Sequence, residues 1–371
     1  MTLSTRVDVA IRGVRTAAPL QRRGGAGPSD DGHLRLDGRG AALPLDPSSP
    51  YLVRDGRLWR EDGCGAGPTT GPEGAGLPEP VLTDTGVEVE EVARPAFYDL
   101  RTASGVPYEH LARVHGDGVL ATTVVQTCIR YAQDQRCRFC SIEESLRAGL
   151  TTAVKRPEEL AEVAEAAVRL DGVRQLVMTT GTSAGRDRGA RHVARCVRAV
   201  KAAVPDLPVQ VQVEPPEDLS ALAELRAAGA DSLGVHVESL DDDVRRAWMP
   251  GKATVSLDRY RAAWAEGVRL FGRNQVSTYL LVGLGEDPDE LVAGAAELAA
   301  SGVYPFVVPF RPMAGTLAVE VDGARAPDPA VLADVTARVA ADLVARGMRG
   351  ADQRAGCAAC GGCSALAEAG A

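Results

Sequence analysis

The sequence Cys128-Ile-Arg-Tyr-Ala-Gln-Asp-Gln-Arg-Cys137-Arg-Phe139-Cys140 follows directly on an apolar, β-branched run from Gly118 to Thr127. The run predicts a buried strand, which puts the three cysteines on the loop at its carboxyl end. Three thiolates can bind three irons of a [4Fe–4S] cubane, and the fourth iron then stays open to an external ligand. Structural zinc is the alternative, but zinc prefers four closed ligands, and no fourth cysteine or histidine lies near the loop. We therefore predict a redox-active cluster here.

Predicted strands and helices alternate after this loop. A helix is expected at 157–170, where proline takes the first position and glutamates follow in the first turn. Strands are expected at 173–179, 208–213, 231–237, 275–282 and 303–309, and helices near 187–204, 217–229, 256–267, 287–300 and 328–346. Apolar strands that alternate with amphipathic helices are typical of a parallel sheet covered by helices. Six such units predict an α/β fold with a partial (β/α)6 TIM-type barrel, whose chemistry gathers at the carboxyl ends of the strands.

Three regions are expected along the chain. Residues 1–117 form an N-terminal accessory region. Residues 1–80 or so are irregular and rich in turns, although 51–59 is typical of a hairpin across Asp55-Gly56 and suggests a small β domain. The partial barrel covers 118–325. Residues 326–371 add a last helix and a cysteine-rich tail.

Composition and charge disfavour a nucleic-acid or membrane partner. The 371 residues can form one large domain and an accessory one. The net charge is −9 and no block of like charge dominates, which disfavours a nucleic-acid partner. No apolar run approaches the ~18–20 residues of a membrane span, and charged residues interrupt the N-terminal segment, so no signal-peptide core can form. We expect a cytoplasmic protein with no membrane partner and with reduced thiols.

A second group of cysteines ends the chain, in Cys357-Ala-Ala-Cys360-Gly-Gly-Cys363. Three cysteines at two-residue gaps match ferredoxin spacing and predict an auxiliary iron–sulfur cluster. Its fourth iron is either open or bound by a remote residue such as Cys64. Zinc with a remote ligand and a disordered tail with incidental cysteines are the alternatives. Cys196 shares an apolar helix face and is predicted to be core.

The loop at 128–140 resembles the cluster-binding loop of the radical S-adenosylmethionine (SAM) superfamily. Phe139 matches the aromatic residue before the third cysteine, whereas the first gap has eight residues and the commonest pattern has three. Thr180, Gly181 and Thr182 follow a strand at the place where the superfamily has a Gly-rich turn for the methionine amino group. The resemblance implies that these residues bind SAM; an ordinary turn between strand and helix is the alternative.

Two later segments resemble biotin and lipoyl synthases. His236 and Glu238 lie on one face of a predicted buried strand, where those enzymes carry polar residues that bind the SAM ribose. Alternatively, the two residues satisfy each other in the core. Val282 and Gly283 belong to the segment 280–286, which is similar to the Gly-Leu-Gly-Glu strand end of lipoyl synthase. In lipoyl synthase this strand end lies beside the adenine.

Two arginines are candidates to pair with the SAM carboxylate. Arg245 follows Glu238 at the spacing found in lipoyl synthases. Arg311 lies in a segment, 308–312, similar to the last barrel strand and loop of biotin synthase relatives. For each arginine taken alone, a solvated surface position is the alternative.

The chain is also similar to a narrower family, the radical SAM proteins encoded beside nitrilase-like proteins in bacterial gene clusters. The segments that suggest this are Gly24–Asp30, Arg94–Asp99 and Leu120–Val124. The resemblance implies nitrogen metabolism, with a small nitrogen-containing metabolite as the substrate and nitrilase-like proteins as partners.

The implied activity is reductive cleavage of SAM to a 5′-deoxyadenosyl radical that abstracts hydrogen from the substrate. A flavodoxin or ferredoxin would supply the electron. Sulfur insertion, with the C-terminal cluster as sulfur donor, is an alternative outcome. A zinc-stabilised, non-catalytic binding protein is the alternative from a different class.

Overall fold

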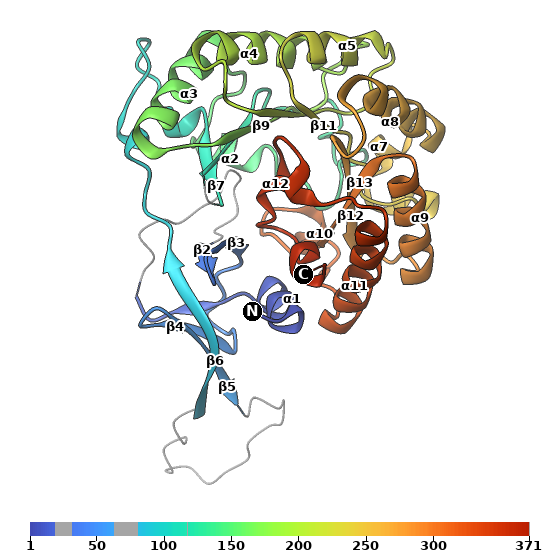
Figure 1. Ribbon diagram of the computed structural model, residues 1–371. Helices are drawn as coiled ribbons and strands as arrows, with labels where there is room; N and C mark the ends of the chain where they lie inside the picture. Colours follow the sequence, from blue (N-terminus) through green and yellow to red (C-terminus); the bar gives the residue numbers. More distant parts are fainter. Residues whose placement is uncertain (19–31, 63–80, 117, 371) are drawn as a thin grey trace.

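The computed structural model describes residues 1–18, 32–62, 81–116 and 118–370. Its larger part is a curved seven-stranded sheet in the order β13-β12-β11-β10-β9-β8-β7 (Figure 1). The strands are β7 (Arg113–His115), β8 (Val119–Thr123), β9 (Gln175–Thr179), β10 (Val209–Gln212), β11 (Ser232–Gly234), β12 (Val276–Val282) and β13 (Val303–Pro309). Neighbours from β8 to β13 pair in parallel, and β7 is antiparallel to β8.

Helices cover the outer face of this sheet (Figure 1). They are α3 (Pro157–Asp171), α4 (Ala190–Ala203), α5 (Ser220–Ala227), α8 (Leu257–Phe271), α9 (Pro288–Ala300) and α11 (Pro329–Ala345). Local sequence fixes where they begin: Asp287 caps α9 by accepting from two backbone N–H groups, and Pro288 takes the first helical position. Every residue of β13 is buried, as expected for a strand covered on both faces. The predicted α/β fold with a partial barrel is confirmed.

The N-terminal region is more regular than the sequence indicated. Helix α1 (Leu3–Arg12) precedes a six-stranded sheet in the order β1-β4-β5-β6-β2-β3. These strands are β1 (Arg15–Thr16), β2 (Gly32–Leu36), β3 (Arg39–Leu43), β4 (Tyr51–Arg54), β5 (Arg57–Asp62) and β6 (Val81–Glu91). The hairpin across Asp55-Gly56 is confirmed. The expectation of an irregular region was wrong for the described residues. The sequence did not reveal these strands because they are short and have little apolar periodicity. The segments 24–30 and Cys64 lie outside the described residues.

The C-terminal segment closes the amino end of the barrel. The Asn274 amide donates to the carbonyl of Arg349 at 2.9 Å, the Gly356 N–H donates to the Gln175 side chain at 2.6 Å, and the Ser364 hydroxyl donates to the carbonyl of Val307 at 2.6 Å. These bonds hold η3 (Gly350–Asp352), α12 (Cys357–Cys360) and α13 (Leu366–Ala369). This part of the chain is therefore folded against the sheet.

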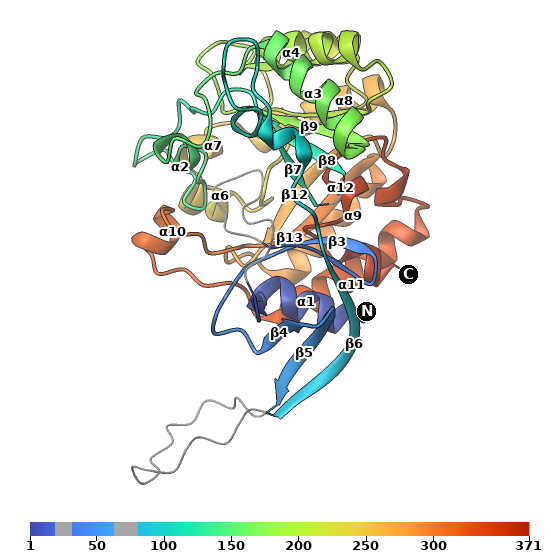
Figure 2. The ribbon, with the colours of Figure 1, turned by 90° about the vertical axis from the view of Figure 1, so that its left-hand side faces the viewer.

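Short helices gather on the opposite side, at the carboxyl ends of the strands (Figure 2). They are α2 (Glu144–Arg147), α6 (Asp242–Trp248), α7 (Pro250–Ala253) and α10 (Leu317–Glu320), while η1 (Ala96–Asp99) and η2 (Tyr108–His110) precede β7. In Figure 2 these four short helices lie to the left of the sheet, and α12, which contains Cys357 and Cys360, lies to the right.

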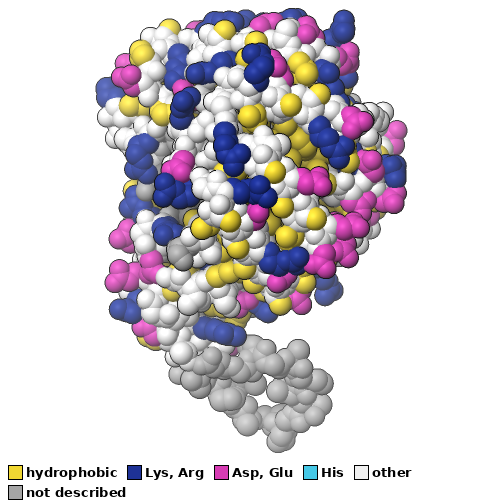
Figure 3. Space-filling view, turned by 45° about the vertical axis from the view of Figure 1, so that its right-hand side comes forward, with side chains coloured by type: hydrophobic (Ala, Val, Ile, Leu, Met, Phe, Trp, Pro, Cys, Tyr) yellow, Lys and Arg dark blue, Asp and Glu magenta, His cyan; other side chains and the backbone are white. Residues whose placement is uncertain are grey.

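The surface shows mixed charge. On the face drawn in Figure 3, basic and acidic side chains are interspersed around apolar ones. Among the described residues, no helix combines the length and the apolar character that crossing a membrane requires.

Candidate functional site

The three cysteines of the first group border one cavity. Cys128, Cys137 and Cys140 line a space of about 250 Å³ at the carboxyl ends of β8 to β11. Within the described residues, no three His, Cys, Asp or Glu side chains are close enough to hold a single metal ion. Three thiols that line a cavity of this size can hold a multi-iron cluster. Burial raises the pKa of Cys140 to about 11, and it also raises that of Cys137, so binding a cation would be needed to hold these thiolates.

Hydrogen bonds fix the cysteine loop. Arg136 donates to the carbonyl of Cys140 at 2.7 Å and to that of Gly315 at 2.9 Å. Arg130 forms a two-pronged ion pair with Glu214, at 2.7 and 3.0 Å, in which the two side chains are only 10% and 5% exposed. Because both nitrogens of the fork are bonded, the loop keeps a single orientation.

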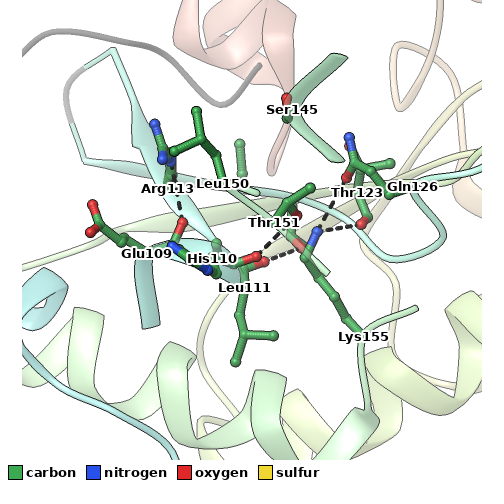
Figure 4. Close-up of a pocket in the computed structure, with 13 residues that line it drawn as sticks. Glu109, His110, Leu111, Arg113, Thr123, Gln126, Ser145, Leu150, Thr151 and Lys155 are labelled. Carbon is green, nitrogen blue, oxygen red and sulfur yellow. Dashed lines mark hydrogen bonds between the residues drawn. The ribbon is translucent and has the colours of Figure 1, made fainter. Parts of the chain in front are cut away.

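Residues that line a small pocket beneath the loop hold the chain on both sides of the loop (Figure 4). The Nζ of Lys155 donates to the carbonyl of Thr123 at 2.6 Å and to the Gln126 side chain at 3.3 Å. Gln126 in turn donates to the carbonyl of Ile142 at 2.7 Å. Residues on both sides of the three cysteines are thereby tied to one buried lysine.

The predicted turn after β9 lies at the cavity. Thr180, Gly181 and Thr182 all line it. A Cβ atom on Gly181 would lie 2.1 Å from the carbonyl oxygen of Thr127, so only glycine fits there. The glycine therefore lets the turn approach the strand end just before Cys128.

His236 and Glu238 both line the cavity, but they do not satisfy each other as a core pair. Glu238 accepts from the ammonium of Lys252. The Nδ1 of His236 accepts from the N–H of Tyr279 at 3.2 Å, and the two rings are stacked with centroids 4.0 Å apart. Burial, with a smaller contribution from Lys252, lowers the pKa of His236 to about 3, so the ring is neutral. Its Nε2 is buried and bonded to no group in the described chain, which fits a site that awaits a ligand acceptor.

Several cavity residues were missed in the sequence analysis. Arg130, Gln212, Glu214 and Lys252 all line the cavity. A signal existed for Lys252, which follows Pro250-Gly251 and is one of only three lysines in a chain rich in arginine. Arg130, Gln212 and Glu214 could be assigned to the cavity only once the neighbouring strands and loops were known.

Some predicted residues lie elsewhere. Phe139 lines the cavity as expected, but Arg245, Val282, Gly283 and Arg311 are not among its lining residues. Arg245 is neither solvated nor at the cavity: it is 1% exposed, is paired with Asp242 at 2.6 Å and donates to the carbonyl of Val255. It thus holds the start of α6 to the chain before α8.

The C-terminal cysteines lie at the other end of the barrel interior. The hydroxyl of Tyr279 donates to the sulfur of Cys357 at 2.7 Å, and the amide of Gln212 donates to the same sulfur at 3.4 Å. The Nε2 of His115 lies 3.2 Å from the sulfur of Cys363. These cysteines are therefore not on a loose tail. Cys196 is fully buried in the core, as predicted.

Known proteins are similar to parts of this chain. Residues 134–299 match the family profile described as the Radical SAM superfamily. The bacteriochlorophyllide c C-7(1)-hydroxylase of Chlorobaculum limnaeum is 27% identical over 208 residues, 51% of this chain and 51% of that protein. The lipoyl synthase of Thermus thermophilus is 30% identical over 181 residues, 45% of this chain and 50% of that protein. The chain thus spans about half the length of the curated relatives it matches.

Among solved structures, methylornithine synthase is similar over 68% of each chain, with a TM-score of 0.49 and 19% identity. The segment that matches the family profile contains Cys137, Cys140 and the strand ends that carry His236 and Glu238. The matched segment, residues 134–299, is therefore similar to the radical SAM superfamily, which supports a SAM-dependent enzyme.

Proposed function

We propose that this protein cleaves SAM reductively at a [4Fe–4S] cluster bound by Cys128, Cys137 and Cys140. The 5′-deoxyadenosyl radical formed in this way abstracts hydrogen from a small nitrogen-containing metabolite. The observation that carries the proposal is the convergence of three thiols from one loop on a cavity of about 250 Å³ that polar side chains from the ends of the neighbouring strands also line.

The cavity residues suit such a cofactor. When bound, the cluster supplies the electron that breaks a sulfonium bond of SAM, and the protein supplies orientation and exclusion of water. His236, neutral and with a free Nε2–H, can donate to a ribose oxygen. The turn at 180–182 offers backbone groups for the methionine end, and Lys252 offers a cation for the carboxylate in addition to its bond with Glu238.

The fate of the substrate radical has two candidates. The first is oxidation, rearrangement or fragmentation of the metabolite, with a second iron–sulfur cluster at Cys357, Cys360 and Cys363 as an electron acceptor or substrate ligand. The second is sulfur insertion, which the similarity to lipoyl synthases favours. Loss of cluster sulfide during turnover would distinguish them, because only sulfur insertion consumes it.

The partners belong to the same proposal. A flavodoxin or ferredoxin supplies the reducing electron, and nitrilase-like proteins act on the same metabolites. The enzyme works in the cytoplasm, where its thiols stay reduced. The six parallel strands form the (β/α)6 barrel that holds both cofactors. The chain has three parts, which are the accessory region at 1–117, the barrel at 118–325 and the cysteine-bearing segment at 326–371.

Anaerobic incubation with SAM and dithionite tests the central step. The iron-loaded protein should release 5′-deoxyadenosine, and a Cys140→Ala variant should release none. Cys196→Ala is the matched control, because this buried cysteine lies outside both cysteine groups. Absence of 5′-deoxyadenosine from a fully loaded parent protein, or its release by Cys140→Ala, would contradict the proposal.

A further inference from the structure

The interior of the barrel between the two cysteine groups is only one layer of side chains thick. Gln212 lines the cavity of the first group, and its amide nitrogen lies 3.4 Å from the sulfur of Cys357 in the second group. Tyr279 makes a second link. Its ring is stacked on His236, which lines the cavity, and its hydroxyl donates to Cys357 at 2.7 Å.

The backbone that carries Cys357 is shaped for this position. Gly356 has a φ of +120°, and a Cβ atom there would lie 2.1 Å from the amide nitrogen of Gln210, a fully buried side chain of β10. Only glycine fits both the backbone conformation and the space. The Gly356 N–H also donates to Gln175 at 2.6 Å. Strand residues thus guide the segment into the barrel directly before the first cysteine.

Donors surround the sulfurs of this group. Cys357 accepts two hydrogen bonds, and Cys363 lies 3.2 Å from His115 Nε2, at the end of β7. Hydrogen bonds to ligand sulfurs stabilise the more negative, reduced state of an iron–sulfur cluster and so raise its reduction potential. The Tyr279 bond is the shorter of the two to Cys357.

We infer that Cys357, Cys360 and Cys363 hold a second iron–sulfur cluster at the floor of the SAM cavity, with the Tyr279 hydroxyl as a positioning group that raises its reduction potential. This inference rests on the second cofactor proposed above. It adds the place of that cofactor and the residue that tunes it. The cluster faces the cavity across Gln212, His236 and Tyr279, so it is placed to exchange single electrons with species formed there.

The test removes the first cluster. A background protein with Cys128→Ala, Cys137→Ala and Cys140→Ala, reconstituted anaerobically, should retain about four irons per chain. In this background, Tyr279→Phe should keep the iron and shift the midpoint potential, measured by EPR-monitored titration, to a more negative value. Tyr304→Phe is the control. It removes a buried hydroxyl from the next strand, and that hydroxyl faces Gly350. It should leave the potential unchanged.

Circular dichroism of each variant should first match that of the parent, so that lost folding is recognised. A folded background protein that binds no iron, or binds only zinc, would overturn the second cluster. An unchanged potential in Tyr279→Phe would overturn the role of the hydroxyl. Neither result bears on SAM cleavage by the parent protein, because that step uses the other cysteines and is read from 5′-deoxyadenosine.

Discussion

Lys252 and Glu238 form a buried ion pair at the wall of the cavity, with side chains that are only 15% and 12% exposed. Burial alone would lower the pKa of Lys252, but the carboxylate of Glu238, with smaller contributions from Tyr260 and Cys137, outweighs burial and raises it. The lysine therefore keeps its charge beside the cysteine loop. A fixed cation at this place can attract both the cluster thiolates and an anionic group of the ligand.

Replacing Lys252 by methionine should disrupt both stability and SAM binding. It leaves Glu238 buried without its partner, which costs about 3–5 kcal/mol of unfolding free energy. The double variant Lys252→Met/Glu238→Gln removes both charges and should recover most of this stability while SAM binding stays weak. Denaturant unfolding and calorimetric titration with SAM measure the two effects. Full SAM affinity in the double variant would show that the cation serves only the fold.

Replacing His236 by phenylalanine should weaken SAM binding with little effect on the iron content. The phenyl ring keeps the stacking on Tyr279 but loses the buried Nε2–H that faces the cavity. One hydrogen bond in such a site contributes about 1.4 kcal/mol, so the Kd for SAM should rise about tenfold. The Tyr279 N–H also loses its acceptor, which should cost about 1 kcal/mol of stability. Unchanged SAM affinity would mean that Nε2 faces no ligand atom.

The sequence predicted the barrel well because strand and helix periodicity is a local property. The apolar run of β13 and the proline and aspartate at the start of α9 can be read without tertiary information. That the three cysteines border one cavity could be predicted equally well, because their spacing on one loop is local too. The short strands of the N-terminal sheet were missed because their pairing, not their periodicity, defines them: β2 pairs with both β3 and β6.

Contacts between distant segments set the rest of the site. Lys252 reaches Glu238 only because α7 folds back over the end of β11. Arg245 has the spacing of a ligand residue but points into the core beside Tyr260, 5.4 Å from its ring. The opposite placement of the two cysteine groups depends on the whole barrel. None of these contacts produces a periodic pattern in the sequence.

Replacing Gly181 by alanine should displace the cysteine loop. The new Cβ would lie 2.1 Å from the Thr127 carbonyl oxygen, so the strand end that carries Cys128 must move. We expect lower iron content at the first site together with a loss of stability. Gly105→Ala is the control: its φ of +87° strains an alanine by about 1–2 kcal/mol, but no atom lies within 4 Å of the new Cβ. Iron loss in the control alone would contradict the assignment.

Replacing Lys155 by methionine should change how stability depends on pH. Burial, with a smaller contribution from Arg113, lowers the pKa of Lys155 to about 7 from 10.5, against an opposing effect of Cys196. Between these two values the unfolded chain binds more protons at this lysine than the folded chain does. Stability from this residue must therefore rise with pH across that window, by about 1.4 kcal/mol per pH unit at most.

Urea unfolding at pH 7, 8 and 9 measures this slope. As pH rises, the unfolding free energy of the parent should increase relative to that of Lys155→Met. Lys201→Met is the control. It removes a lysine paired with Asp231 at 2.9 Å, and its pH profile should follow that of the parent. The iron content of Lys155→Met should also fall, because Lys155 holds Gln126 and through it the carbonyl of Ile142 behind the cysteine loop. A parent and a Lys155→Met variant with parallel pH profiles would mean that this buried amine keeps its charge, and that the loop is anchored by an ammonium throughout the range.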